Sequence, residues 1–146
     1  MTTESNTNHA ARRLGIAWLA LTGAVAVHVW DEAANDFLSV YNPTVTALRE
    51  RLGWFPMPNF TYDVWLNGLI FGVGMLAVLS LGAFAGWRGM RWLAYGYGTL
   101  MLLNAAAHLV LPLVAGRFIP GVYSAPLLLA ASVWLLICAR HWVRQP

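Results

Sequence analysis

The sequence is short of charge, contains no lysine and has a single cysteine. Of its 146 residues, 10% are charged and 59% are hydrophobic, and the mean hydropathy is +0.58. Soluble domains carry about 25% charged residues, and disordered chains are less apolar still, so both classes are excluded. Cys138 stands alone, which excludes an internal disulfide and a zinc site built on cysteine. The chain also has no dinucleotide-binding glycine pattern, phosphate-binding loop or serine-hydrolase motif.

Four apolar segments without formal charge are long enough to cross a membrane. They cover residues 14–30, 64–87, 92–115 and 122–139. A membrane-spanning helix needs about 20 apolar residues, with a range of about 17–25. We therefore expect an all-α membrane protein, a bundle of four transmembrane helices that forms one domain over residues 11–146. Residues 1–10 are mostly polar and are expected to be a disordered tail.

The arginines predict the orientation of this bundle. If the N-terminus is inside, six arginines lie on the inner side and three on the outer side, the inner ones being Arg12, Arg13, Arg88, Arg91, Arg140 and Arg144. The positive-inside rule then places both termini in the cytoplasm. We expect a multi-pass protein of the bacterial inner membrane. The sequence pI of about 9.5 comes from arginines scattered between apolar segments, so no nucleic-acid partner is expected.

The longest connection, residues 31–63, is expected on the outer side. Residues 43–52 predict a short amphipathic helix, because Pro43 suits the first position of a helix and Gly53 suits the position after its end. Its apolar side chains share one face, made of Val45, Leu48 and Leu52. Such a helix would rest on the outer membrane surface.

Polar side chains inside apolar helices mark functional sites or wet cavities by default, because they are costly to bury in lipid. His28, Asp31, Glu32 and Asn35 fall on one arc of a helix that continues past the first apolar segment. Phe37 falls on the opposite side of that helix. We therefore expect the first helix to turn a face of histidine and carboxylates toward the bundle interior.

The other three spans carry polar groups at a similar depth. Asn104 and His108 share one face of the third span, and Tyr97 lies about two turns earlier on that face. Asn67 lies near the start of the second span, and Tyr123 lies at the start of the fourth. Apart from Tyr97, these groups fall within roughly 10 Å of one boundary, given a rise of about 1.5 Å per residue. The histidines of the first and third spans are therefore predicted to be neighbours within about 10 Å, around one outer-side pocket.

The segment His28-Val29-Trp30-Asp31-Glu32 resembles the motif of the HXXEE-motif family of small bacterial membrane proteins, with Asp31 in place of the first glutamate. The pair Asn104 and His108 and the run Pro-Gly-Val-Tyr-Ser-Ala-Pro over residues 120–126 add to this resemblance. It covers most of the chain beyond residue 14 and implies an architecture and a site rather than a reaction. A looser likeness, by analogy alone, is to sterol-isomerase membrane bundles, which also place His and Glu four residues apart on one helix.

These groups favour acid–base chemistry. The candidate catalytic residues are His28, Asp31, Glu32 and His108, and the candidate substrate-binding residues are Asn104, Tyr123, Asn67 and Tyr97. Histidine titrates near working pH and can be oriented by a neighbouring carboxylate, and Glu32 can carry protons. From such a pocket the reachable partners are membrane lipids and a lipidic small molecule: an isoprenoid, a sterol-like molecule or a fatty chain. Isomerisation, hydration or hydrolysis of such a substrate needs no cofactor.

Two other functions stay open. His28, Glu32 and His108 match a ligand set for zinc or iron, so a metal-dependent membrane enzyme is the first alternative. The second is a non-enzymatic lipid-binding or transport protein. A transport path needs polar groups through the whole membrane, and the inner halves of the spans offer only Thr22, Ser80, Thr99 and Ser132. The one-sided cluster therefore favours a pocket.

Overall fold

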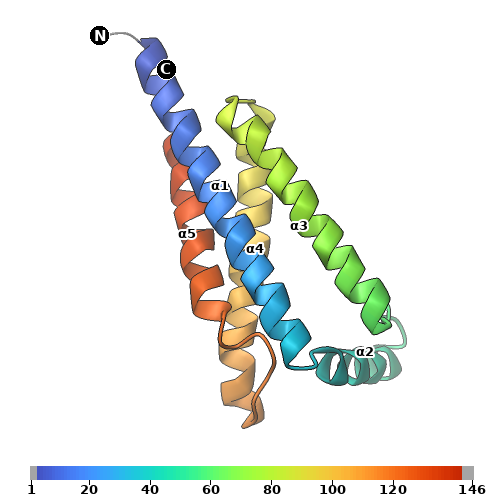
Figure 1. Cartoon of the computed structure of the whole chain (residues 1–146). Helices are drawn as coiled ribbons and strands as arrows, with labels where there is room; N and C mark the ends of the chain where they lie inside the picture. The colour runs from blue at the N-terminus through green and yellow to red at the C-terminus, as the bar shows by residue number, and fades with distance from the viewer. Residues whose placement is uncertain (1–2, 143–146) are drawn as a thin grey trace.

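The structure is a computed structural model that describes residues 3–142, with side chains from residue 8 onward. Within this part of the chain every regular element is a helix (Figure 1), and the helices are α1 (Thr3–Ala34), α2 (Leu38–Leu52), α3 (Tyr62–Phe84), α4 (Gly89–Ala115) and α5 (Ala125–Trp142). α1 starts at Thr3, so residues 3–10, expected in a disordered tail, are helical. No proline or glycine precedes Gly15, and adding residues to an existing helix is cheap compared with starting one.

The prediction of four membrane spans is confirmed over the described residues. The helices long and apolar enough to cross a membrane are Asn8–Ala34, Tyr62–Phe84, Gly89–Ala115 and Ala125–Trp142. The fourth helix starts three residues later than the predicted span, because Gly121 has a left-handed φ of 91° and turns the chain first. The first helix extends beyond its apolar run at both ends.

α2 differs from its prediction at its start. It begins at Leu38, and Pro43 lies inside the helix rather than at its first position. The chain leaves α1 through a turn in which Asp36 has a left-handed φ of 55° and Tyr41 N bonds to Phe37 O, so the helix is under way before Pro43. Proline at this position removes the hydrogen bond to the carbonyl four residues earlier and crowds that carbonyl, so Pro43 is a local cost that the helix bears. The predicted end is confirmed, because Gly53 closes α2 in the left-handed conformation with a φ of 68°.

α2 also does not expose one continuous apolar face. Val45 is buried, whereas Leu52 is 63% exposed. Leu38, in the first turn, is buried as well. The buried side chains therefore belong to the N-terminal half of the helix, which lies across the gap between the end of α1 and the start of α3 (Figure 1).

α1 is the central helix of the bundle. It packs against α3 on one side and α5 on the other, and α4 packs against α5. The most buried side chains between these helices include Leu14, Trp18, Leu21, Leu128 and Leu135. Because lipid tails are as apolar as leucine, close packing rather than hydrophobic burial holds such helices together.

Small residues permit the closest approaches. A Cβ placed on Gly15 would lie 2.5 Å from Phe84 Cδ1, and one on Gly98 would lie 3.0 Å from Leu136. The start of α1 and the end of α5 lie at one end of the bundle, and α2 lies at the other end (Figure 1). α3 and α4 meet at the end near the termini and diverge toward α2.

Candidate functional site

α1 brings three polar side chains to one buried position near its end. His28, Asp31 and Glu32 are 3%, 5% and 7% exposed. Their spacing of three and four residues places them on the same helical face, as predicted. Asn35, just after α1, donates hydrogen bonds to Asp31 Oδ1 at 2.9 Å and to Asp31 O at 2.8 Å. These bonds fix the carboxylate of Asp31 at the point where the helix ends.

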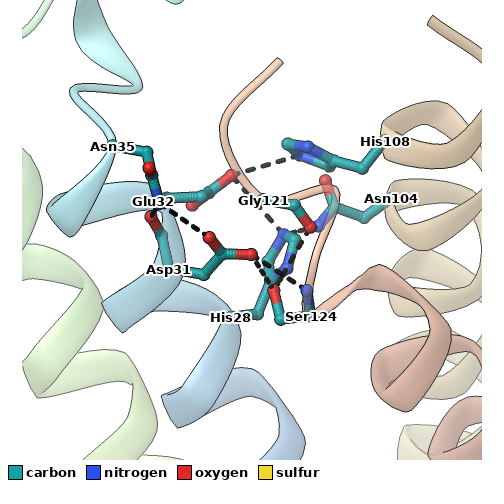
Figure 2. Close-up of polar contacts among 8 residues, drawn as sticks. All are labelled: His28, Asp31, Glu32, Asn35, Asn104, His108, Gly121 and Ser124. Carbon is teal, nitrogen blue, oxygen red and sulfur yellow. Dashed lines mark hydrogen bonds and ion pairs between the residues drawn. The ribbon is translucent and has the colours of Figure 1, made fainter. Parts of the chain in front are cut away.

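The two histidines are neighbours, which confirms the prediction from their matched depth. The rings of His28 and His108 lie 4.7 Å apart between centroids and meet edge to face at 85°. Glu32 lies beside both (Figure 2): its Oε1 is 3.1 Å from His108 Nε2 and 3.5 Å from His28 Nε2. Asn104, one turn before His108 on α4, places its Nδ2 3.1 Å from His28 Nε2. One oxygen of Glu32 therefore contacts both imidazoles.

The connection between α4 and α5 completes this group. Ser124 donates from its backbone N–H and from its hydroxyl to Asp31 Oδ2, at 2.9 and 2.8 Å, and its Oγ is 2.8 Å from His28 Nδ1. The backbone of Gly121 passes so close that an added Cβ would lie 2.6 Å from His108 Nδ1 and 2.9 Å from His28 Cε1. Only glycine satisfies both this approach and the left-handed φ.

These contacts determine which nitrogen of His28 carries the proton. The hydroxyl of Ser124 has one proton and two oxygen acceptors, Asp31 Oδ2 and the carbonyl of Gly121 at 3.2 Å. A carboxylate and a carbonyl cannot donate, so the contact between Ser124 Oγ and His28 requires His28 to donate from Nδ1. In the neutral ring, Nε2 then has a lone pair, and Asn104 Nδ2 donates to it. In this tautomer Nε2 is the unprotonated nitrogen of His28, and Asn104 orients it.

His108 has the opposite arrangement. Its Nε2 lies within hydrogen-bond distance of the acceptor-only carboxylate of Glu32, so Nε2 carries the proton. Its Nδ1 is buried and has no partner among the described residues. Both histidines therefore contact the carboxylate of Glu32, and His108 Nδ1 is the buried nitrogen of this group that has no partner among the described residues.

A cavity of about 420 Å³ opens beside this group. His28, Glu32 and Asn104 form its polar end, and the other walls come from α1, α3, α4, α2 and the segment between α2 and α3. These walls consist of Val25, Val29, Phe37, Tyr41, Met57, Phe60, Val64, Trp65, Gly68, Leu69 and Met101. The polar group therefore faces an apolar chamber between the diverging helices α3 and α4.

A second cavity of about 290 Å³ lies on the other side of the group and is lined by Asp31, Ser124, Asn35 and Tyr123, among others. The polar network thus separates two cavities, with Glu32 and His28 on the first and Asp31 and Ser124 on the second. His28 is linked to both acids: its Nε2 lies 3.5 Å from Glu32 Oε1, and its Nδ1 contacts Ser124, which donates to Asp31 (Figure 2).

The structure does not bring every candidate residue to the first cavity. Tyr123 is 75% exposed and lines the second cavity. Asn67 is exposed, while its neighbour Gly68 lines the first cavity. Tyr97 is half-buried and packs on Trp18, with ring centroids 5.2 Å apart.

Phe37 is a correction to the sequence prediction. It was expected on the side of the helix opposite His28, but its ring lies 5.9 Å from that of His108. The expectation assumed a continuous helix, whereas α1 ends at Ala34 and the turn at Asp36 reverses the direction of the side chain. Left-handed aspartate is uncommon, and the sequence around it carries no glycine or proline to signal the turn.

Sequence reasoning also left Ser124 out of the site. It belongs to the Pro-Gly-Val-Tyr-Ser-Ala-Pro run, and a serine two residues before a proline near a helix start reads as an ordinary helix-start residue. Its bonds to Asp31 and His28 span more than 90 positions of sequence. The glycine of the same run, Gly121, was the available signal that this backbone approaches something closely.

The donor atoms of His28, Glu32 and His108 all lie within 4.8 Å of one another. A tetrahedral ion with bonds of about 2.0–2.1 Å holds its ligand atoms roughly 3.3 Å apart, and the two distances to Glu32 Oε1 are close to this. Two imidazoles and one carboxylate suit zinc or iron. The fit is completed by Ser124, which orients His28 through its other nitrogen, as is usual for metal-bound histidine.

Fold and site together define a polytopic helical membrane protein with a buried group of histidines and carboxylates beside an apolar cavity. The chain belongs to the HXXEE family, described as proteins of unknown function with an HXXEE motif, whose model matches residues 18–135. The matched region contains the whole site, including Gly121 and Ser124. No curated protein and no solved structure matches the chain.

Proposed function

We propose that the protein is a membrane-embedded enzyme that performs acid–base chemistry, of the isomerase or hydratase/hydrolase type, on a lipidic or isoprenoid-like substrate. The observation that carries this proposal is the position of His28 and Glu32 at the polar end of an otherwise apolar cavity of about 420 Å³. Small-molecule sites in proteins usually measure about 300–1,000 Å³ and combine apolar walls with a few polar groups.

The contacts support a role for each group in this proposal. An isomerisation needs one group that removes a proton and another that returns it. His28 Nε2 has a lone pair and accepts the proton, and Glu32 passes protons between the two imidazoles because Oε1 contacts both. His108 donates to Glu32, and Asn104 orients His28.

The polar groups elsewhere in the bundle favour a pocket over a transport path. The hydroxyls of Thr22, Ser80 and Ser132 bond to carbonyls of their own helices, at 3.0, 2.6 and 2.7 Å. Hydroxyls satisfied in this way provide no continuous route for an ion.

The cavity provides the first test. Gly68 lines it, and a Cβ there meets nothing within 4 Å, so Gly68→Phe fills the cavity without a clash in α3. Gly74→Phe is the matched control, because Gly74 is equally unobstructed and lies outside the lining. Lipids extracted from the purified proteins are identified by mass spectrometry. We expect a lipid that co-purifies with the wild type and Gly74→Phe and is lost from Gly68→Phe; equal retention in both variants would contradict the proposal.

A metal-dependent membrane enzyme is the second candidate, and the convergence of the donor atoms of His28, Glu32 and His108 within 4.8 Å favours it. A bound zinc or iron would supply a Lewis acid or an activated water at the polar end of the cavity. Elemental analysis of the same purified sample decides between the candidates. About one metal ion per chain, lost in Glu32→Gln, supports the metal; a metal-free protein with an intact lipid ligand supports acid–base chemistry alone.

We place the protein in the bacterial inner membrane with both termini in the cytoplasm. The support is the arginine distribution and the common end at which α1 starts and α5 finishes. A reporter that is active only in the periplasm should be active when inserted in the segment between α2 and α3 and inactive when fused after residue 146. The reverse pattern would show that the C-terminus lies in the periplasm and would contradict this orientation.

A further inference from the structure

The polar end of the first cavity carries one carboxylate. Glu32 is the only acid among the residues that line it, and within this described lining there is no arginine. The sequence has no lysine at all. His28 and Asn104 are the other polar side chains at this end. A buried carboxylate without an arginine or lysine beside it suits a cationic partner, because an ionised group is costly to bury unless it is paired.

Aromatic rings form the wall next to this end. Phe37 stacks on Trp65 with centroids 5.8 Å apart, and it also meets Tyr41 at 5.5 Å. Tyr41 in turn meets Phe60 at 5.9 Å. All four rings line the cavity. Aromatic faces attract cations, and sites that bind substituted ammonium groups combine several of them.

We propose that this cavity binds single-chain amphiphiles whose inserted head carries a positively charged nitrogen, with Glu32 as its charge partner and the aromatic wall around it. This inference rests on the proposed function, which makes the occupant a lipid. It adds that the head group of that lipid is positively charged. A fatty carboxylate or a phosphate head would lie beside Glu32 with no cation to compensate either charge. The apolar remainder of the cavity, between α3 and α4, holds the alkyl chain.

The test uses the full-length protein in nanodiscs of phosphatidylcholine. Three probes share one alkyl chain with a photoreactive diazirine and differ only in their head: a tertiary amine, an alcohol or a carboxylate. After illumination, peptide mass spectrometry locates the labelled residues. We expect the amine to label lining residues such as Leu69 and Met101 at least about tenfold more than the carboxylate does, and more than the alcohol does.

Variants identify the charge partner. Glu32→Gln should reduce labelling by the amine about tenfold and leave labelling by the alcohol nearly unchanged, since only the charge is removed. Glu50→Gln is the matched control, because Glu50 is exposed on α2 and lies outside the lining. Its labelling should equal that of the wild type. Comparing variants in the same nanodiscs cancels differences in how the probes partition into the lipid.

Each of the remaining outcomes contradicts either the inferred charge selectivity or the proposed function. If the carboxylate labels the lining as strongly as the amine, or if Glu32→Gln leaves amine labelling unchanged, the inferred charge selectivity is wrong while a lipid-binding cavity stands. If no probe labels the lining, the proposed function fails together with the inference. The three probes are compared in the wild-type protein. A folding defect in Glu32→Gln would therefore not prevent a test of whether the cavity prefers a cationic head group.

Discussion

The two ends of the bundle use their polar side chains differently. At the end near the termini, Ser80 of α3 is buried and bonds to a carbonyl of its own helix, and Thr22 and Ser132 in the middle of the bundle do the same. At the end near α2, Ser124 bonds to Asp31 and His28 of another helix. A bond within one helix survives any arrangement of its neighbours, whereas a bond between helices fixes their positions. The difference separates polar groups that are merely accommodated in lipid from those that build a site.

The largest effect should follow from changing Glu32, because its carboxylate contacts both histidines of the site. Glu32→Gln keeps the shape and hydrogen-bonding capacity but cannot exchange protons, so activity should fall about 10²-fold or more. The measurement is the lipid profile or growth of cells that depend on the protein, with the melting temperature as a check on folding.

Asp31→Asn provides the comparison for Glu32→Gln. Asp31 faces the second cavity and reaches the histidines only through Ser124. Its amide variant should therefore be less impaired. If Asp31→Asn abolishes activity while Glu32→Gln does not, the roles of the two acids are reversed; if neither variant loses activity, the acid–base proposal fails.

Two left-handed glycines separate the effect of backbone strain from that of contact with the site. Gly121→Ala adds a Cβ that would overlap His108, so it should lower the free energy of unfolding by roughly 2 kcal/mol or more and displace His108. Gly116 has a similar φ of 61° but nothing within 4 Å, so Gly116→Ala should cost only about 1 kcal/mol of strain.

Thermal or denaturant unfolding in detergent measures both glycine variants. Equal losses would mean that the close approach of Gly121 to the histidines contributes nothing to stability.

A smaller effect should distinguish two buried serines. Ser124→Ala leaves His28 Nδ1 without a partner and removes one of the two bonds to Asp31 Oδ2, so it should cost roughly 1–3 kcal/mol. Ser132→Ala removes one bond to Leu128 O within α5, and its effect should stay within about 0.5 kcal/mol. The same unfolding experiment compares them. Similar values for both serines would remove the distinction between hydroxyls bonded within one helix and those bonded between helices.

Much of this architecture could be predicted from the sequence. Runs of apolar residues identify membrane spans because only helices satisfy the backbone in lipid. Once the spans are placed, depth alone brings His28 and His108 together. The pairing of Glu32 with His28 follows from helical spacing.

What could not be predicted depends on turns and on long-range contacts. The approach of Ser124 to Asp31 is set by the left-handed turn at Gly121, and the position of Phe37 is set by a left-handed Asp36. Such conformations leave no periodic pattern in the sequence. Pro43 was misleading because its preference for the first turn of a helix is statistical, and the preceding residues were already helical.

The protonation of the two buried histidines tests the proposed chemistry most directly. Nitrogen-15 NMR of histidine-labelled protein in nanodiscs distinguishes the nitrogen that carries a proton from the one that does not, and His28→Gln and His108→Gln assign the signals. The contacts predict a proton on Nδ1 of His28 with a bare Nε2 facing Glu32, and a proton on Nε2 of His108. A proton on Nε2 of His28 near neutral pH would contradict the account, because the cavity would then have no free base.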